Sequence, residues 1–231
     1  MKEILDAKGW RLCRTIGASP LAPDFYLAGG TGLALQLRHR RSLDLDFFAG
    51  RPAERIATAA IIRTIQRLFG PAVTIELSQA DQVTWNIGGT MVTFMAYPFP
   101  LLEPLVPGER ISRNLAGLSL ASPGEIALMK AYSLGRRATF RDYVDLYFLL
   151  QRQIVTLQYI LEAAPRKFVI GGERVFSPRL FLEQLTYTRD LDDRNAALEL
   201  VLGKSVTAST VEEFLRTQVR GFLESRVLER G

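Results

Sequence analysis

The sequence predicts an α+β protein with a mixed sheet of about five strands in its first part and a mostly helical second part. Short apolar and alternating runs, typical of strands, recur up to about residue 97. One of them leads through Gly-Gly-Thr into a helical pattern, and the next contains Asp-x-Asp. From Ser122 onward, helix-start signals and helical spacing dominate. We therefore expect two domains, over residues 1–105 and 106–231.

The first domain is expected to alternate helices and strands. Helices are predicted over 2–16, 31–36 and from about Pro52 to Gly70, and strands over 25–28, 43–48, 73–77, 82–87 and 90–96. Gly88-Gly89 predicts a two-residue hairpin between the last two strands. In 43–48 the residues Leu43, Leu45 and Phe47 alternate with two aspartates, which predicts one core face and one acidic face.

The second domain begins with a strong helix start at 122–125, where Ser, Pro and Glu stand in capping order, and this helix should reach about Leu134. Further helices are predicted from Thr139, over 155–164 and from Ser177. Residues 168–176 fit a small hairpin or a loop. Ser209 with Glu212 predicts the cap of a last helix, whose apolar stripe is Val211, Phe214, Leu215, Val219, Phe222 and Leu223.

The composition is that of an ordinary globular protein of 231 residues, with 48% hydrophobic and 23% charged residues. The net charge of +5 permits a polyanionic partner, although the arginines are spread along the chain. Cys13 is the only cysteine, which excludes an internal disulfide and a cysteine-based metal site. No apolar run approaches the ~18 residues of a membrane helix, and the first residues lack a signal-peptide core. We therefore expect a cytoplasmic protein without a membrane partner.

Gly29-Gly30-Thr31 and the pair Asp44 and Asp46 form the first candidate site. A strand alternates faces with period two, so both carboxylates should project from one face. The glycines let the backbone approach a bulky anion, and the helix that follows directs its free amides toward that anion. A phosphate cradle beside paired carboxylates is what metal-dependent phosphoryl transfer needs.

The second candidate site consists of Lys130, Asp142 and Asp145. The two aspartates are three apart and share a helical face, and Lys130 could return across the helical hairpin to meet them. Such a lysine could hold a triphosphate, and a carboxylate could position an attacking hydroxyl. The alternative interpretation is a surface ion pair in which Asp142 stabilises the first helical turn.

Both patterns resemble one protein family. Gly29-Gly30-Thr31 followed by His39-Arg40-x-Ser42-x-Asp44-x-Asp46-Phe47, and then Lys130 with Arg141-Asp142-x-x-Asp145-Leu146, look like the signature of nucleotidyltransferase toxins of AbiEii/AbiGii type. The resemblance spans roughly residues 25–150. It implies the minimal nucleotidyltransferase fold, as in DNA polymerase beta, followed by a helical domain that completes the active-site cleft.

The resemblance also implies a toxin with a cognate antitoxin. The implied reaction moves a nucleoside monophosphate from an NTP to an acceptor hydroxyl, with RNA such as a tRNA 3′ end as the acceptor. Asp44 and Asp46 would hold Mg²⁺ (or Mn²⁺), Lys130 would neutralise charge, and Asp145 or Asp142 would orient the hydroxyl. The implied nucleotide-binding residues are Gly29, Gly30, Thr31, Arg40 and Ser42.

One position departs from polymerase-like sites, which commonly use a third carboxylate from a neighbouring strand. The alternation in 92–94 puts Thr93 there, and Glu76 lies on another strand without a motif around it. Without a third carboxylate, Asp44 and Asp46 could still hold a single metal–nucleotide complex. Alternatively, the chain is an inactive nucleotide- or RNA-binding module. A transferase that acts on a protein acceptor is the third interpretation. His39, the only histidine, is expected to be structural.

Three expectations for variants follow. Asparagine at Asp44 or Asp46 should reduce transfer by several orders of magnitude. Gly30→Val should weaken NTP binding, because a side chain would occupy the phosphate's approach. Lys130→Ala should abolish transfer while changing stability by less than about 1 kcal/mol, as expected for an unburied charge. Lys130 and the aspartate pair should line one pocket.

Overall fold

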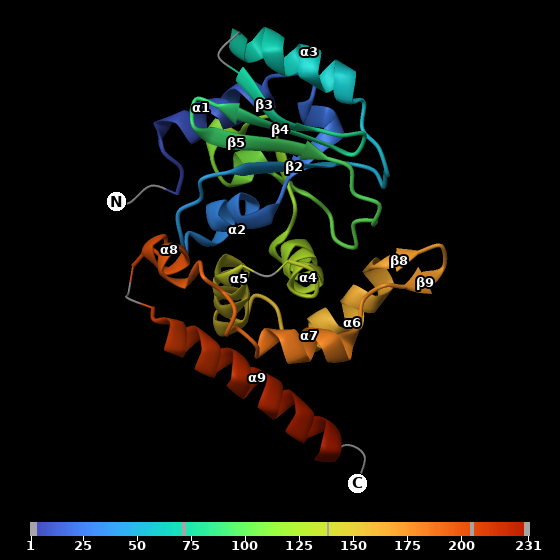
Figure 1. The fold of residues 1–231 in the computed structure, drawn as a ribbon, viewed down its shortest axis with the longest axis vertical. Helices are drawn as coiled ribbons and strands as arrows, with labels where there is room; N and C mark the ends of the chain where they lie inside the picture. Colours follow the sequence, from blue (N-terminus) through green and yellow to red (C-terminus); the bar gives the residue numbers. More distant parts are fainter. Residues whose placement is uncertain (1–3, 71–72, 138, 204–205, 229–231) are drawn as a thin grey trace. The chain divides into compact units, whose positions relative to one another are not determined.

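The structure is a computed structural model that describes residues 4–70, 73–137, 139–203 and 206–228. The chain divides into two compact units, Met1–Ser122 and Pro123–Gly231, and each is described by itself (Figure 1). The first unit extends past residue 105, because the chain after that residue still adds strands to its sheet. The functional division into a nucleotidyltransferase-like domain and a helical domain stays a prediction.

The first unit is built on a mixed sheet that has seven strands within the described residues, in the order β3-β4-β5-β2-β1-β7-β6. Its elements are α1 (Ala7–Gly17), β1 (Phe25–Leu27), α2 (Gly29–Leu37), β2 (Leu45–Ala49), α3 (Thr58–Phe69), β3 (Val73–Ser78), β4 (Gln82–Ile87), β5 (Thr90–Met95), β6 (Val106–Pro107) and β7 (Ser119–Leu120). Short 3₁₀ turns cover Ala22–Asp24, Gly108–Arg110 and Arg113–Leu115. The predicted α+β class is confirmed, and β6 and β7 make the sheet larger than five strands.

β2 lies in the middle of this sheet, parallel to β5 and antiparallel to β1. The sheet's core is aromatic: the Phe47 and Phe94 rings stack with centroids 4.8 Å apart, and Trp85 meets Phe94 edge-on. Helix α3 packs on β3 and β4, and α2 packs on β2. Figure 1 shows these two helices on opposite faces of the sheet.

Two local expectations in this unit need correction. Helix α2 begins at Gly29, so the glycine pair is its first turn and does not precede it. Strand β2 begins at Leu45, and Leu43, expected on the core face, is 59% exposed. The reason is that Leu43 lies in the segment before the strand, where alternation no longer fixes its side. The predicted hairpin at Gly88-Gly89 is confirmed, since β4 and β5 pair up to Ile87 and Thr90.

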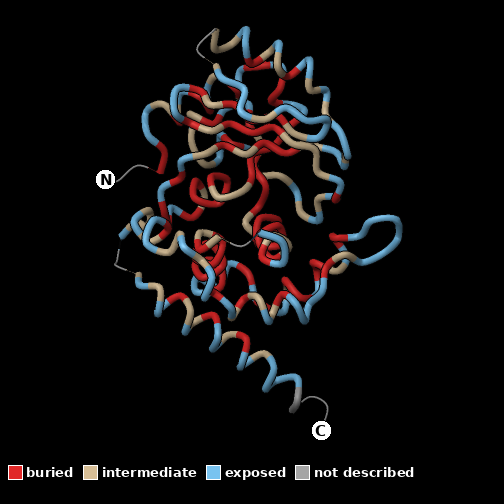
Figure 2. The backbone as a smooth tube through the Cα atoms, viewed as in Figure 1, coloured by how far each residue is buried: buried red, intermediate tan, exposed pale blue. Residues whose placement is uncertain are grey.

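The second unit is helical, with a two-stranded hairpin. Its elements are α4 (Pro123–Leu134), α5 (Phe140–Gln151), α6 (Leu157–Lys167), β8 (Val169–Ile170), β9 (Glu173–Arg174), α7 (Pro178–Leu185), α8 (Arg194–Glu199) and α9 (Ala208–Leu228). Helices α4 and α5 pack against each other and carry most of its buried residues (Figure 2). Of the two alternatives for residues 168–176, the hairpin is the one that forms.

The long helix α9 begins one residue earlier than its predicted cap. The Thr207 hydroxyl accepts the Thr210 amide at 3.1 Å, so Thr207 takes the capping position expected of Ser209. The apolar stripe is buried at Val211, Leu215 and Val219, but Leu223 is 50% exposed. The buried part of the stripe therefore ends near the middle of the helix.

Within the described part of the chain, no helix has both the length and the apolar character required to cross a lipid bilayer.

Candidate active site

The first turn of α2 presents free backbone amides. Ala28 occupies the N-cap and provides no side-chain acceptor, and the first intrahelical bond runs from the Gly32 amide to the Ala28 carbonyl at 2.9 Å. The amides of Gly29, Gly30 and Thr31 therefore precede the helical hydrogen-bond ladder. Such a helix start, with the positive end of its dipole, is suited to phosphate.

Gly29 lies directly against the carboxylate of Asp46. Its φ of +58° is in the left-handed region, and a Cβ built there would lie 2.8 Å from Asp46 Oδ2. The Ala28 amide also donates to the Asp46 carbonyl at 3.0 Å. The absence of a side chain at Gly29 thus lets the Asp46 carboxylate sit beside the start of α2.

Gly30 has a different neighbour. A Cβ there would collide with the guanidinium of Arg40, which is 2% exposed and donates through Nη1 to the Arg41 carbonyl at 3.0 Å. The space that a Gly30 side chain would need is therefore filled by protein. This corrects the reason for the glycine, which was expected to leave room for phosphate.

The hydroxyls of Thr31 and Ser42 join α2 to the segment that enters β2. Thr31 Oγ1 lies 2.6 Å from Ser42 Oγ and also hydrogen-bonds the carbonyl of Asp44. Thr31 is 1% exposed, and His39 beside this segment is fully buried. These hydrogen bonds hold the backbone that carries Asp44, so Ser42 helps to fix the entry to the strand.

Asp44 and Asp46 are both partly exposed, whereas Leu45 and Phe47 on the opposite strand face are fully buried. The register pairs Asp46 with Thr93 of β5, the position where a third carboxylate was sought. Thr93 Oγ1 lies 3.1 Å from Thr84 Oγ1 on β4, so two neutral hydroxyls continue this face of the sheet.

Glu76 does not replace the missing carboxylate. It lies on the edge strand β3, at an irregularity in the pairing with β4, and is exposed. Two strands separate β3 from β2, which at about 4.8 Å per strand puts Glu76 roughly 14 Å from the aspartate pair. Among the residues that the structure describes, no three acidic, histidine or cysteine side chains gather as a metal site. Two carboxylates remain, and their hard oxygens fit Mg²⁺.

The second motif comes together as a cluster between α4 and α5. Lys130 Nζ lies 2.5 Å from Asp142 Oδ1 and 2.9 Å from Asp145 Oδ2. Lys130 and Asp142 keep 11% of their side chains exposed, and Asp145 keeps none. The return of Lys130 across the helical hairpin is thus confirmed. Of the alternative interpretation, the surface location is wrong because the cluster is almost entirely buried, whereas the ion pair and the stabilisation of the first helical turn by Asp142 are present.

Asp142 also caps the start of helix α5. Its Oδ2 accepts the Thr139 amide at 3.3 Å and the Thr139 hydroxyl at 3.2 Å, which completes a capping box at the start of α5. Burial raises the pKa of neighbouring Tyr143 to about 12, with a further contribution from the Asp142 charge. The Tyr143 hydroxyl donates to the carbonyls of Gln184 and Tyr187. Since Lys130 itself is buried, the expectation that it is an unburied charge is also wrong.

Sequence reasoning missed a second ion pair on α4. Lys167 Nζ lies 2.7 Å from Glu125 Oε2, and both side chains are fully buried. Burial lowers the pKa of Lys167, while the bond to Glu125 acts in the opposite direction. Glu125 was read only as a helix-cap residue, and Lys167 has no motif around it. Forty-two residues separate the partners, so no local pattern could have paired them.

Comparisons with known proteins identify the family. A family model described as the nucleotidyl transferase AbiEii toxin of a type IV toxin–antitoxin system matches residues 10–225. An uncharacterized protein of Aquifex aeolicus is 29% identical over 202 residues, covering 87% of this chain and 89% of that protein.

Two solved structures share the fold. MenT4, a nucleotidyltransferase toxin of Mycobacterium tuberculosis, aligns with a TM-score of 0.56 at 16% identity, over 93% of this chain and 82% of that one. A candidate nucleotidyltransferase of H. pylori aligns with a TM-score of 0.53 at 13% identity, over 97% and 96% of the two chains. At these identities the likeness concerns the fold.

Proposed function

The chain belongs to the AbiEii nucleotidyl transferase toxin family and is an enzyme of the nucleotidyltransferase class, and from this premise we propose that it transfers a nucleoside monophosphate from an NTP to a hydroxyl of RNA, with a tRNA 3′ end as the preferred acceptor. The reaction depends on Mg²⁺ or Mn²⁺. A cognate antitoxin is the proposed protein partner, as the type IV toxin–antitoxin family suggests.

The position of Asp46 supports this proposal most. Its carboxylate lies against Gly29 at the start of α2, so a hard oxygen ligand and free helix amides stand side by side. Asp44 and Asp46 would hold Mg²⁺, which would supply Lewis-acid charge at the phosphoryl oxygens. The amides of Gly29, Gly30 and Thr31 bind the triphosphate.

In the proposed reaction the acceptor hydroxyl oxygen bonds to the α-phosphorus of the NTP. The bond from that phosphorus to the oxygen bridging to the β-phosphate breaks, pyrophosphate leaves, and the hydroxyl proton passes to a carboxylate or to solvent. No oxidant or further reactant is needed. Lys130 neutralises phosphate charge; of the two aspartates expected to orient the hydroxyl, Asp142 keeps part of its side chain exposed and takes that role, whereas the fully buried Asp145 holds the Lys130 ammonium.

Arg40 and Ser42 take supporting roles in this proposal. Both are buried, Arg40 against Gly30 and Ser42 against Thr31. They act on the nucleotide by holding the first turn of α2 and the approach to Asp44. Arg40 is therefore a positioning residue in this proposal.

The test is incubation with each labelled NTP, Mg²⁺ and total RNA, followed by separation of labelled RNA from labelled protein. We expect label in RNA for the native chain, and a loss of several orders of magnitude for Asp46→Asn. Glu76→Gln is the matched control, because it makes the same carboxylate-to-amide change on the exposed edge strand. Label in protein and not in RNA would show that the acceptor is a protein. No label in either, with intact NTP binding, would favour the inactive binding module.

We further propose that Lys130 binds a phosphate of the NTP. A triphosphate with one Mg²⁺ and two aspartates is net negative, so a fixed cation is required. The affinity for Mg²⁺–NTP should therefore fall for Lys130→Met and for Asp46→Asn. Unchanged affinity in folded Lys130→Met would separate the second cluster from the nucleotide.

A further inference from the structure

A hollow lined by arginines lies in the second unit, between the segment after α7 and the first half of α9. Its volume is about 520 Å³, and the residues that line it are Thr186, Tyr187, Thr188, Arg189, Arg194, Glu212 and Arg216. We call it the arginine hollow. A second depression of about 280 Å³ shares Glu212 and Arg216, is also lined by Glu213, and continues along α9 to Arg220. Together they form a track along the start of the helix.

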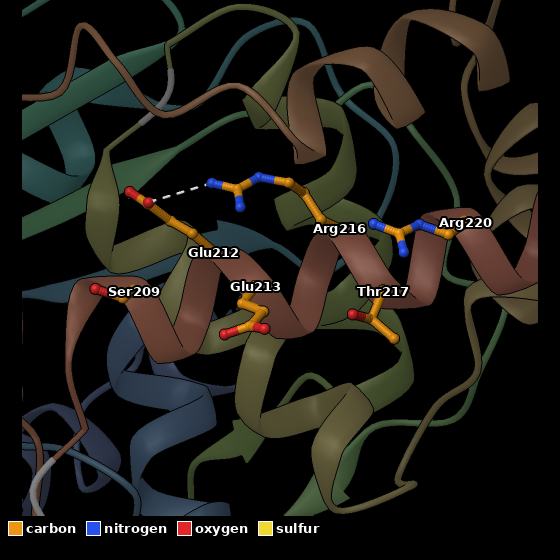
Figure 3. A pocket seen from close by; sticks show the side chains of 6 residues that line it. All are labelled: Ser209, Glu212, Glu213, Arg216, Thr217 and Arg220. Atoms are coloured by element: carbon orange, nitrogen blue, oxygen red, sulfur yellow. Dashed lines mark hydrogen bonds and ion pairs between the residues drawn. The ribbon is translucent and has the colours of Figure 1, made fainter.

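Glu212 holds the side chains of the arginine hollow in place. Glu212 Oε1 accepts the Thr188 hydroxyl at 2.7 Å and lies 3.4 Å from Arg194, while its Oε2 lies 3.5 Å from Arg216. Figure 3 shows Arg216 extended toward Glu212, with Arg220 one turn further along the helix. The arginine hollow thus holds three arginines and one glutamate, so it keeps an excess of positive charge.

The arginines differ in what they can offer to a ligand. Arg194 also donates to the Thr188 carbonyl and is one-third exposed, so it belongs to the framework of the hollow. Arg216 is 52% exposed, and Arg189 and Arg220 are exposed as well. Guanidinium groups with this freedom can bind phosphates in a bidentate way.

An exposed aromatic ring stands beside these arginines. Tyr187 is 47% exposed, its hydroxyl donates to Asp190 Oδ2 at 2.7 Å, and its carbonyl accepts the buried Tyr143 hydroxyl. The ring also lines a neighbouring hollow of about 270 Å³ that contains Arg136. A ring held in this way, next to arginines, is the arrangement on which unpaired bases stack.

We propose that the arginine hollow binds the single-stranded part of the RNA acceptor. Arg189, Arg216 and Arg220 contact successive phosphates, and Tyr187 stacks on one base. This rests on the proposed function in one respect, namely that the acceptor is RNA. The arginines would be sufficient to bind a ligand that consists of phosphate alone. The exposed ring beside them favours a ligand that also carries bases.

The test is the binding of a fluorescently labelled single-stranded RNA to the full chain without NTP. We expect the double variant Arg189→Gln, Arg216→Gln to raise Kd roughly tenfold to a hundredfold and to reduce the dependence of log Kd on log salt by about 0.7 per lost contact. Tyr187→Leu should raise Kd about fivefold to a hundredfold. Tyr187→Phe should bind like the native chain, because it keeps the ring.

Arg179→Gln is the matched control. Arg179 is an exposed arginine of the same unit, 2.8 Å from Glu183 on α7, and it does not line the hollow. Single-arginine variants Arg189→Gln and Arg216→Gln are compared with it one by one. Equal effects at all three positions would mean diffuse attraction and would overturn the proposal. So would an unchanged Kd in Tyr187→Leu, or full displacement of RNA by equimolar inorganic phosphate.

The two proposals fail in different ways. If RNA binds in the hollow but receives no nucleotide, the proposed reaction fails and the binding surface stands. If RNA is labelled while the hollow variants keep the native KM for RNA, the reaction stands and the hollow is overturned as the acceptor site. Thermal unfolding of each variant serves as the folding check, and Arg194 and Glu212 are left unchanged because they form the framework.

Discussion

Helix α4 contributes to two lysine–carboxylate clusters that differ in their access to solvent. Glu125 pairs with Lys167, and both side chains are fully buried. Five residues further along the helix, Lys130 meets Asp142 and Asp145, and there Lys130 and Asp142 keep 11% of their side chains exposed. The chemistry of the two clusters is the same, and they lie on the same helix.

The difference in solvent access indicates that the Glu125–Lys167 pair belongs to the scaffold and that the Lys130 cluster belongs to the candidate site. A sealed ion pair has no path for a ligand, so Glu125 and Lys167 can only hold α4 against α6. The Lys130 cluster reaches solvent through the lysine and Asp142, so a phosphate can compete with the aspartates for the ammonium. Burial therefore predicts that variants of the first cluster change stability, whereas variants of the second change stability and nucleotide binding.

The largest effect on stability is expected for Lys167→Met. The variant removes the ammonium that lies 2.7 Å from the buried Glu125 carboxylate, which should lower the free energy of unfolding by about 3–5 kcal/mol. Urea denaturation measures it. The double variant Glu125→Leu, Lys167→Met should recover most of the loss, since an apolar pair needs no compensation. A single variant within about 1 kcal/mol of native would contradict the assignment of this pair as scaffold.

Lys130→Met should have a smaller effect on stability and a clear effect on the ligand. We expect a loss of about 2–3 kcal/mol, below that of a sealed pair because water still reaches Asp142. The affinity for Mg²⁺–NTP, measured by calorimetry, should fall as well. Lys130→Arg keeps the charge and is the matched control. If Lys167→Met weakened nucleotide binding as strongly as Lys130→Met, the distinction between the clusters would be lost.

The distinction between a site residue and a residue of the scaffold can also be tested with two glycines of equal φ, one in each unit. Gly29 and Gly171 both have φ +58°, but a Cβ at Gly29 would meet Asp46, and one at Gly171 would meet nothing within 4 Å. Alanine at either position should cost about 1–2 kcal/mol of stability, because the backbone conformation is strained in both. Only Gly29→Ala should lose nucleotidyl transfer. Equal loss of transfer in both variants would show that the displaced carboxylate is not the cause.

The last effect is confined to alkaline pH and arises at Tyr143, next to the Lys130 cluster. Burial raises the pKa of Tyr143 to about 12, against an ordinary value of 10.0. Between these values the unfolded chain has lost the phenol proton and the folded chain retains it, so stability should decline as pH rises from about 10 to about 12. Denaturation midpoints across this range, compared with Tyr143→Phe, measure it. A profile that Tyr143→Phe does not flatten would refute the assignment to Tyr143.

The fold could be predicted where the pattern is local. The helix over Pro123–Leu134 and the strands around the Gly88-Gly89 hairpin follow from capping and turn residues, so they were predicted nearly to the residue. Errors arose where packing chooses between equal local options. Thr207 caps α9 in place of Ser209, and β6 and β7 are too short to leave a periodic signal.

The sequence by itself determined which residues could form the candidate site. A strand, two glycines, a helix and Asp-x-Asp follow one another within about twenty residues, and a spacing of three places Asp142 and Asp145 on one helical face. Geometry over such short distances is fixed by backbone periodicity, so spacing put Asp44 and Asp46 on one face, and the family resemblance of the second motif added Lys130 as a candidate.

Only the tertiary structure decided what surrounds these residues. It placed Asp46 against Gly29, filled the space beside Gly30 with Arg40, and sealed Glu125 with Lys167. Each of these contacts joins different elements of the fold. Whether a charge is buried or reaches solvent depends on which elements pack over it, and spacing along the chain carries no record of that packing.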